Sequence, residues 1–245
     1  MIFPYEQDLA YSALLGNGRF NATLVGARFS RFFHPIDVPH DVRLRFGIYE
    51  KTGDLEWLEP GPIKMNDGVF YSGPVDFFID SSEPVLAIRV KSETPVAVHW
   101  AMRIGCTNTE NSAQFTNGML AFFRRANWFG MKAPMSQHSC GHELSGHLEN
   151  GKLDGSDVAM KDCEVAAILE PNPEIFIAAG NSIKSVGDTI KRAHYIGFDE
   201  MLSRTRETWK NLEGPLKTSS FVLALLQGES GAVLAAPEFD PEYRY

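Results

Sequence analysis

With 245 residues, of which 44% are apolar and 22% are charged, the chain can bury one large core or two small ones, and its composition excludes an intrinsically disordered protein. Its formal net charge of −8 at pH 7 disfavours nucleic acid and anionic membranes as partners, whereas a neutral ligand is not repelled. Three cysteines are too few for a disulfide framework, and neither a leader peptide nor a membrane-length apolar run is apparent, so a cytoplasmic protein is expected.

Residues 1–180 are predicted to be mainly β, because apolar residues recur there at every second position. The pattern is clear from Val96 to Ile104, and it is typical of an antiparallel strand with one buried and one solvated face. The run from Val165 to Leu169 is apolar on both faces, so we expect a central strand there. Further strands are predicted at residues 19–25, 28–34, 43–48, 69–72, 75–80, 85–91, 119–124, 158–163 and 174–179.

Five Asn-Gly or Asp-Gly pairs predict two-residue hairpin turns between these strands. Asn, Asp and Gly best tolerate the positive φ angles that a type I′ turn needs. The pairs are Asn17-Gly18, Asp67-Gly68, Asn117-Gly118, Asn150-Gly151 and Asp154-Gly155. Many short strands joined by such turns favour a large antiparallel β-sandwich.

Helical spacing replaces the alternation after Asn181. Two successive apolar stripes are formed by Ile183, Val186, Ile190 and Ala193, and by Phe198, Met201, Leu202, Thr205, Trp209 and Leu212. A third helix, at about 218–227, is apolar nearly all round and should be buried on several sides. We therefore expect a β-sandwich domain at 1–180, a helical linker at 181–214 and the start of another domain at 215–245.

Two segments carry a resemblance to a known family. The opening LLGNGRFNATLVG, residues 14–26, resembles the strand-turn-strand that begins many family 15 glycoside hydrolases. The segment SSFVLALLQGESGAVLAAPEFDPEYRY, residues 219–245, is similar to the first barrel helix and following loop of the prokaryotic members. That family includes glucoamylases, glucodextranases and trehalases. The resemblance implies an N-terminal β-sandwich, linker helices and an (α/α)6 barrel, of which this chain is expected to hold only the first helix.

The resemblance also implies a reaction and where its residues lie. In the family, one glutamate protonates the glycosidic oxygen and a second activates water on the opposite face, which gives inversion. Both lie downstream of the matching segments, so we expect no catalytic residue and no activity in this chain. The parent protein is expected to cleave α-glucosidic bonds in maltooligosaccharides or starch, as a glucoamylase does. A trehalase of the same family, a stand-alone glucan-binding sandwich and a purely structural domain are the alternatives.

Tyr243 is the one candidate substrate-binding residue. By resemblance it matches a family tyrosine that lines the subsite for the non-reducing glucose, and the substrate would be shared with the catalytic domain. The alternative is that Tyr243 and the neighbouring Tyr245 are both loop residues without a role in binding. Glu238 and Asp240 lie two residues apart in the same loop, and such neighbours cannot face each other across a substrate as an acid and a base. No cofactor is expected.

Two further clusters each allow a functional and a structural interpretation. His138, Cys140, His142 and His147 offer a zinc-type ligand set, but alternate residues on a strand lie about 6.6–7 Å apart, so no metal is expected and a polar edge strand is favoured. The second cluster is a set of nine aromatic residues, which could form a sugar-binding platform but which core packing explains better. They are Phe29, Phe32, Phe33, Phe77, Phe78, Phe122, Phe123, Trp128 and Phe129.

The apolar helix at 218–227 also suggests a partner. Without a barrel its apolar side chains need cover, and a second copy of the chain could provide it, so a homodimer formed through residues 215–245 is a further hypothesis.

Overall fold

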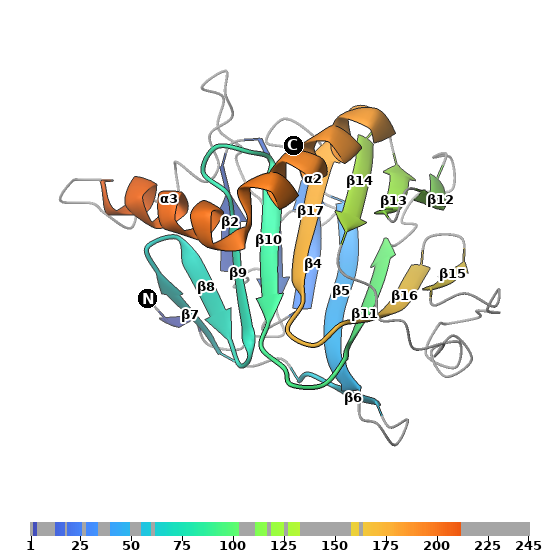
Figure 1. The fold of residues 1–245 in the computed structure, drawn as a ribbon, viewed down its shortest axis with the longest axis horizontal. Helices are drawn as coiled ribbons and strands as arrows, with labels where there is room; N and C mark the ends of the chain where they lie inside the picture. Colours follow the sequence, from blue (N-terminus) through green and yellow to red (C-terminus); the bar gives the residue numbers. More distant parts are fainter. Residues whose placement is uncertain are drawn as a thin grey trace, which may run out of the picture.

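The computed structural model describes residues 2–3, 13–17, 19–25, 28–33, 40–49, 55–59, 62–102, 111–116, 119–124, 127–132, 158–161 and 164–211. These residues form two packed antiparallel β-sheets with two helices on one side (Figure 1). The prediction of a mainly β, antiparallel sandwich is therefore confirmed. The predicted barrel helix at 218–227 lies outside the described residues.

Sheet A, as we name it, has nine strands within the described residues. Their order across the sheet is β1 (Ile2–Phe3), β7 (Ile63–Asn66), β8 (Val69–Ser72), β9 (Val75–Ile79), β10 (Val85–Val90), β17 (Glu174–Gly180), β14 (Asn127–Lys132), β13 (Met119–Arg124) and β12 (Asn111–Thr116). Neighbouring strands are antiparallel throughout, as the hairpin-rich sequence predicts.

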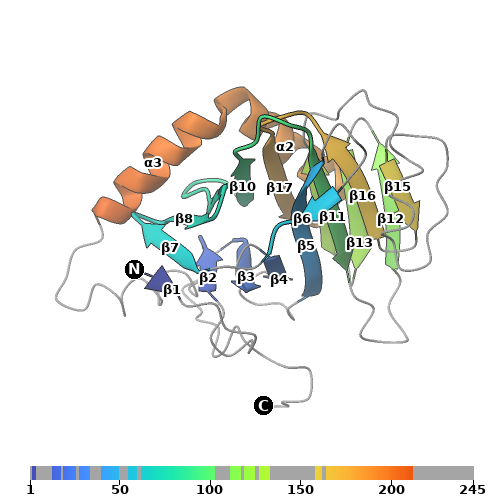
Figure 2. The same cartoon turned by 90° about the horizontal axis from the view of Figure 1, so that it is seen from below.

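Sheet B is the second layer. Its strands run in the order β15 (Val158–Lys161), β16 (Glu164–Leu169), β11 (Val96–Met102), β5 (His40–Tyr49), β4 (Arg28–Phe33), β3 (Asn21–Val25) and β2 (Ala13–Gly16), and β6 (Leu55–Trp57) pairs with the end of β5. Figure 2 shows sheet B on the side of sheet A away from the helices.

The main core lies between the two sheets. The inward residues of β11 are Val96, Val98 and Trp100, as their alternation predicts, and all three are fully buried. The rings of Phe70 and Phe77 stack across β8 and β9 with their centroids 5.8 Å apart. Burying large apolar side chains of this kind contributes about 1.5–3 kcal/mol each, so this layer stabilises the sandwich.

The prediction of a half-buried strand is wrong for β11, because its outward residues Ala97 and His99 are also buried. The reason is tertiary: β6 pairs with β5 and brings Trp57 over this face. The Trp57 ring lies 6.2 Å from the His99 ring in an edge contact, and the guanidinium of Arg45 lies 4.1 Å from the Trp57 centroid. The prediction that the run Val165–Leu169 is buried on both faces is supported by β16, whose residues from Ala166 to Leu169 are buried.

Turns confirm two predicted hairpins and correct a third. Asp67 and Gly68 both have positive φ, at 48° and 74°, between β7 and β8. Strands β12 and β13 pair with Thr116 opposite Met119, which leaves two residues for the connection. The prediction is wrong at Asn17, since Gly16 pairs with Asn21 and four residues join β2 to β3. The other two pairs, at 150–151 and 154–155, lie outside the described residues.

Two helices follow the last strand of the described chain. α2 (Ile183–Ile196) begins at Ser182, whose side chain accepts a hydrogen bond from the Ser185 amide, and α3 (Phe198–Lys210) follows directly after Gly197. Gly197 has φ of 83°, a conformation that glycine adopts without strain and that ends α2 before α3 begins. Neither helix is long and apolar enough to cross a lipid bilayer.

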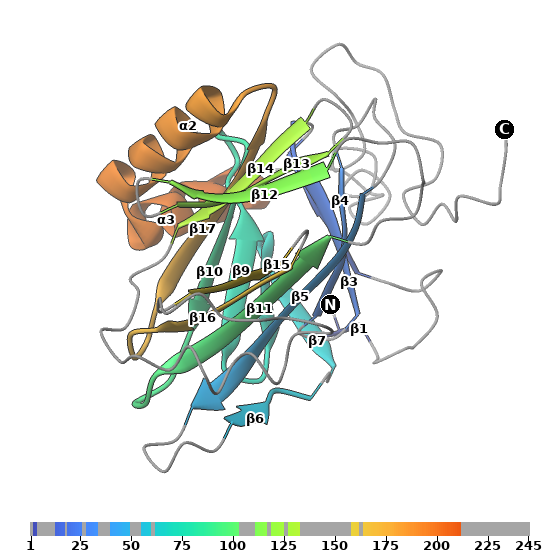
Figure 3. The ribbon, with the colours of Figure 1, turned by 90° about the vertical axis from the view of Figure 1, so that its right-hand side faces the viewer.

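Both helices pack on the outer face of sheet A, where they build a second core (Figure 3). Val186 and Ile190 of α2 and Phe198 and Met201 of α3 are buried there against Phe78, Phe176 and their neighbours. α2 lies so close to β14 that a Cβ atom on Gly130 would be 2.5 Å from Val186. The division of the chain into a sandwich domain and a linker remains a proposal.

Candidate functional site

The residues that the sequence singles out for chemistry lie outside the described part of the chain. These are Tyr243 and Tyr245, Glu238 and Asp240, and the cluster of His138, Cys140, His142 and His147. Their roles stay predictions. Within the described residues, no three His, Cys, Asp or Glu side chains gather closely enough to hold a metal ion.

Of the nine aromatic residues, those whose side chains are described pack in the core. Phe77, Phe78 and Phe129 are fully or almost fully buried, and Trp128 packs partly buried against the second core. The other five lie in β4 and β13, and their side chains are outside the described set. The described members therefore form no exposed aromatic platform.

The most concentrated polar network of the described residues surrounds Asp80, at the end of β9. Its carboxylate is fully buried and accepts two hydrogen bonds from Arg204 of α3, from Nε at 2.7 Å and from Nη2 at 2.5 Å. The same carboxylate accepts from the amides of Ser82 and Glu83, so that it also fixes the loop that joins β9 to β10. A buried carboxylate with four donors is fully compensated, which is the condition for keeping a charge in a core.

Asn17 holds the same loop from the side of sheet B. Its Nδ2 donates to the carbonyls of Asp80 and Glu83, each at 2.7 Å, while its Oδ1 accepts from the amides of Arg19 and Phe20. One side chain thus closes its own turn and ties that turn to the loop of the other sheet. This use of both ends of the amide explains why the predicted two-residue turn is not formed here.

Helix α3 is attached to the sheet by further polar contacts. Thr205 accepts from the Ser81 amide at 3.2 Å, and Arg206 donates to the Tyr71 hydroxyl at 2.7 Å. Arg89 of β10 pairs with Asp199 at 2.9 Å and with Glu174. Burial alone would lower the pKa of Arg89, but the hydrogen bonds that it donates to Glu174 and Asp199 outweigh burial and raise the pKa. These contacts set the position of α3 along its whole length.

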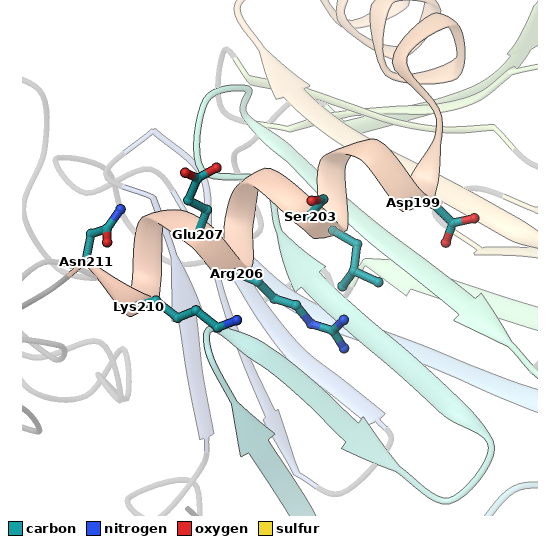
Figure 4. A pocket seen from close by; sticks show the side chains of 7 residues that line it. Asp199, Ser203, Arg206, Glu207, Lys210 and Asn211 are labelled. Atoms are coloured by element: carbon teal, nitrogen blue, oxygen red, sulfur yellow. The ribbon is translucent and has the colours of Figure 1, made fainter.

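An open groove runs along α3 (Figure 4). Its described lining comes from α3 alone and includes Asp199, Ser203, Arg206 and Glu207. The two carboxylates invite comparison with a hydrolytic acid/base pair. However, eight residues along a helix separate them by about 12 Å, which exceeds the spacing of about 6.5–9.5 Å that an inverting pair needs. Asp199 is moreover held by Arg89, so we assign no catalysis to this groove.

A second cavity, of about 490 Å³, lies where the chain passes from β6 of sheet B to β7 of sheet A. We call it the β6–β8 cavity. Its described lining includes Leu58, Glu59, Lys64 and Tyr71. The cavity combines apolar surface with two side chains of opposite charge, an arrangement suited to binding a small polar molecule.

The sequence analysis missed Asp80, Arg204 and the cavity. The sequence does contain a local signal for Asp80. This residue is followed by Ser81-Ser82-Glu83-Pro84, and an Asp before such a stretch commonly accepts hydrogen bonds from the amides two and three residues further on. Arg204 and the cavity had no such signal. Their partners are distant in the chain, and only the packed fold brings them together.

Comparison with known proteins finds matches among solved structures but none among family models or curated sequences. No protein-family model matches the chain, and no curated protein sequence matches it significantly. Among solved structures, the chain is similar to a bacterial glucoamylase crystallised in complex with acarbose, with a TM-score of 0.62 and 14% sequence identity. The match covers 91% of this chain and 42% of that chain, so the protein spans less than half of the enzyme's length. At this identity the likeness shows the fold.

Proposed function

We propose that the chain forms the N-terminal, non-catalytic part of an inverting glycoside hydrolase that acts on α-glucosidic bonds, as a glucoamylase does. The observation that carries the proposal is the fold match, which extends over 91% of this chain yet less than half of the glucoamylase. The similarity of residues 14–26 and 219–245 to family 15 segments supports it independently of the fold.

In this proposal, a catalytic domain supplies the acid and the base, and the sandwich stabilises and orients that domain. The polar network of the described chain suits such a role. Asp80, Asn17 and Arg204 lock one loop, one turn and one helix into a fixed arrangement, and a rigid scaffold is what positions a neighbouring domain reproducibly. Trehalase of the same family is the alternative within this class.

Glucose release tests the proposal. The 245-residue chain alone should release no glucose from maltotriose, dextrin or trehalose above a heat-inactivated control. A longer protein that joins the chain to its catalytic domain should release glucose. NMR should show β-glucose as the first product, because an inverting enzyme converts an α-linkage into the β-anomer. Turnover by the chain alone, or the α-anomer as first product, would contradict the proposal. Preference for maltotriose over trehalose separates glucoamylase from trehalase.

A stand-alone glucan-binding module is the second candidate. The β6–β8 cavity favours it, since a cavity with a tyrosine in its wall is a plausible sugar site without any catalytic domain. The two candidates differ in one measurement: a binding module stays inactive in every longer form of the protein, whereas a hydrolase part gains activity with its catalytic domain.

A further inference from the structure

The β6–β8 cavity has walls from two short segments that meet at one end of the sandwich. Leu58, Glu59 and Pro62 come from the crossing between the sheets, and Tyr71 and Pro74 from the end of β8 and the turn after it. Its volume of about 490 Å³ falls within the range of small-molecule sites, about 300–1,000 Å³. Neither segment would form a site alone, so the fold creates the cavity.

Two residues of the walls, Leu58 and Tyr71, are held in place by contacts of their own. The Leu58 amide donates to the Phe46 carbonyl at 2.9 Å, and the Leu58 side chain packs against the main core. Tyr71 is partly buried, its hydroxyl accepts from Arg206 at 2.7 Å, and it lies opposite Lys64 in the strand register. A preformed site spares a ligand the cost of ordering the protein, which favours even modest contacts.

The chemistry of the lining points to one class of ligand. Leu58, Pro62, Pro74 and the Tyr71 ring provide apolar surface, and Glu59 and Lys64 add an acceptor and a donor whose charges cancel. A pyranose ring has apolar C–H faces and a rim of hydroxyl groups that both donate and accept, so it matches both features. A purely apolar ligand would desolvate two charged groups without hydrogen-bonding them, and an anion is opposed by the net charge of −8.

We propose that the β6–β8 cavity binds a neutral oligosaccharide, with the sugar ring against Tyr71 and its hydroxyl groups on Glu59 and Lys64. If the function proposed above holds, the ligand is an α-glucan chain, and the sandwich then holds the polymer as well as supporting the catalytic domain. The α3 groove is a weaker candidate, because its described lining comes from one helix and is dominated by charged side chains.

An NMR titration of the labelled 245-residue chain with maltoheptaose tests the site. We expect chemical-shift changes at residues 58–59, 62–64 and 71–74, with a Kd of about 1 mM, typical of few contacts. Lys64→Ala should weaken binding about tenfold, because a hydrogen bond to a charged group is lost. Lys64 is exposed, so the variant should fold. Lys184→Ala, the same change at an exposed site on α2, should leave the Kd unchanged.

Tyr71 provides a second pair of variants. Tyr71→Phe keeps the ring and should bind within about threefold of the unchanged chain, whereas Tyr71→Ala should lose most binding. Equal binding by all of these variants would overturn the site. So would the absence of shift changes in both segments at about 10 mM maltoheptaose and 10 mM cellopentaose.

Cellopentaose separates the site from the proposed function. Binding of maltoheptaose that depends on Lys64 supports both. Binding of cellopentaose alone, again lost in Lys64→Ala, supports the cavity as a sugar site but contradicts the assignment to α-glucans. If neither sugar binds, the site is wrong, while glucose release by the longer protein still decides the proposed function on its own.

Discussion

Arg204 donates two hydrogen bonds to the carboxylate of Asp80, a residue 124 positions earlier in the chain, and thereby fixes helix α3 to the end of strand β9. The carboxylate is fully buried, while the side chain of Arg204 is 27% exposed. The two-point geometry allows only one orientation of the helix over the sheet. A buried ion pair of this kind specifies an arrangement more than it adds stability, because desolvation offsets much of its attraction.

Removing one partner of this pair should therefore be costly. Arg204→Met leaves the buried Asp80 carboxylate without its countercharge, and we expect it to lower the free energy of unfolding by about 3–5 kcal/mol. Urea denaturation followed by circular dichroism measures the change. Lys184→Met is the matched control, since it breaks only the exposed pair with Asp188 and should change the stability by less than about 0.5 kcal/mol. Equal effects of the two substitutions would show that the pair does not anchor α3.

Position 68 requires glycine because of its backbone conformation and because the side chain of Trp209 lies against it. Its φ is 74°, and a Cβ atom there would lie 1.8 Å from Cδ1 of Trp209, which closes the end of α3 on the β7–β8 turn. Gly73 also has a positive φ, of 56°, but open space around it. We expect Gly73→Ala to cost about 1–2 kcal/mol from backbone strain, and Gly68→Ala to cost at least about 1 kcal/mol more from the clash.

Thermal unfolding of both glycine variants checks this, and a double variant isolates the clash. Adding Trp209→Ala to Gly68→Ala should make the second substitution less harmful than Trp209→Ala is alone. If Gly68→Ala and Gly73→Ala prove equally destabilising, then Trp209 does not occupy the position described.

Asn17 should not tolerate a change to aspartate. Asn17→Asp keeps the oxygen that accepts from Arg19 and Phe20 but replaces the donor that faces two carbonyls, so we expect a loss of about 1–3 kcal/mol. Asn181→Asp is the same substitution at an exposed position just before α2, where a negative charge favours the helix dipole, and it should cost nothing. Urea denaturation compares them, and equal tolerance would refute the double role of Asn17.

His194 on α2 should titrate below its ordinary value. Partial desolvation beside Phe176, whose ring lies 4.8 Å from the imidazole, lowers the pKa of His194, and the charge of Lys132 lowers it further. NMR should therefore find this pKa below 6.5, and Lys132→Gln should raise it. A pKa at or above 6.5 would contradict the environment described.

The lowered pKa of His194 also determines the direction in which pH changes the stability of the folded chain. The unfolded chain takes up a proton near pH 6.5 that the folded chain resists, so the contribution of His194 to stability is present above pH 6.5 and is lost as the pH falls from there through the lower pKa of the folded chain. His194→Gln should remove this part of the pH dependence. A variant whose stability falls with pH as steeply as that of the unchanged chain would refute the assignment.

The sequence alone determined the elements that a repeating pattern defines. Alternation placed β8, β9, β10 and β13 almost to the residue, and helical spacing placed α2 and α3, because burial on one face imposes those periods on the chain itself. Strands β7, β12 and β14 were missed although they are as long as β8 or β13, because polar residues or glycine fill at least half of their positions. The resemblance of two segments to a hydrolase family likewise needed only local residues.

Only the tertiary structure decided which distant residues meet. Nothing in the chain near Asp80 or Arg204 names its partner, and nothing local says that Trp57 covers His99 and so buries the second face of β11. The β6–β8 cavity likewise exists because residues 58–59, 62 and 64 are brought together with residues 71–74 at one end of the sandwich. Long-range contacts of this kind depend on how two sheets and two helices pack, and packing leaves no periodic trace in the sequence.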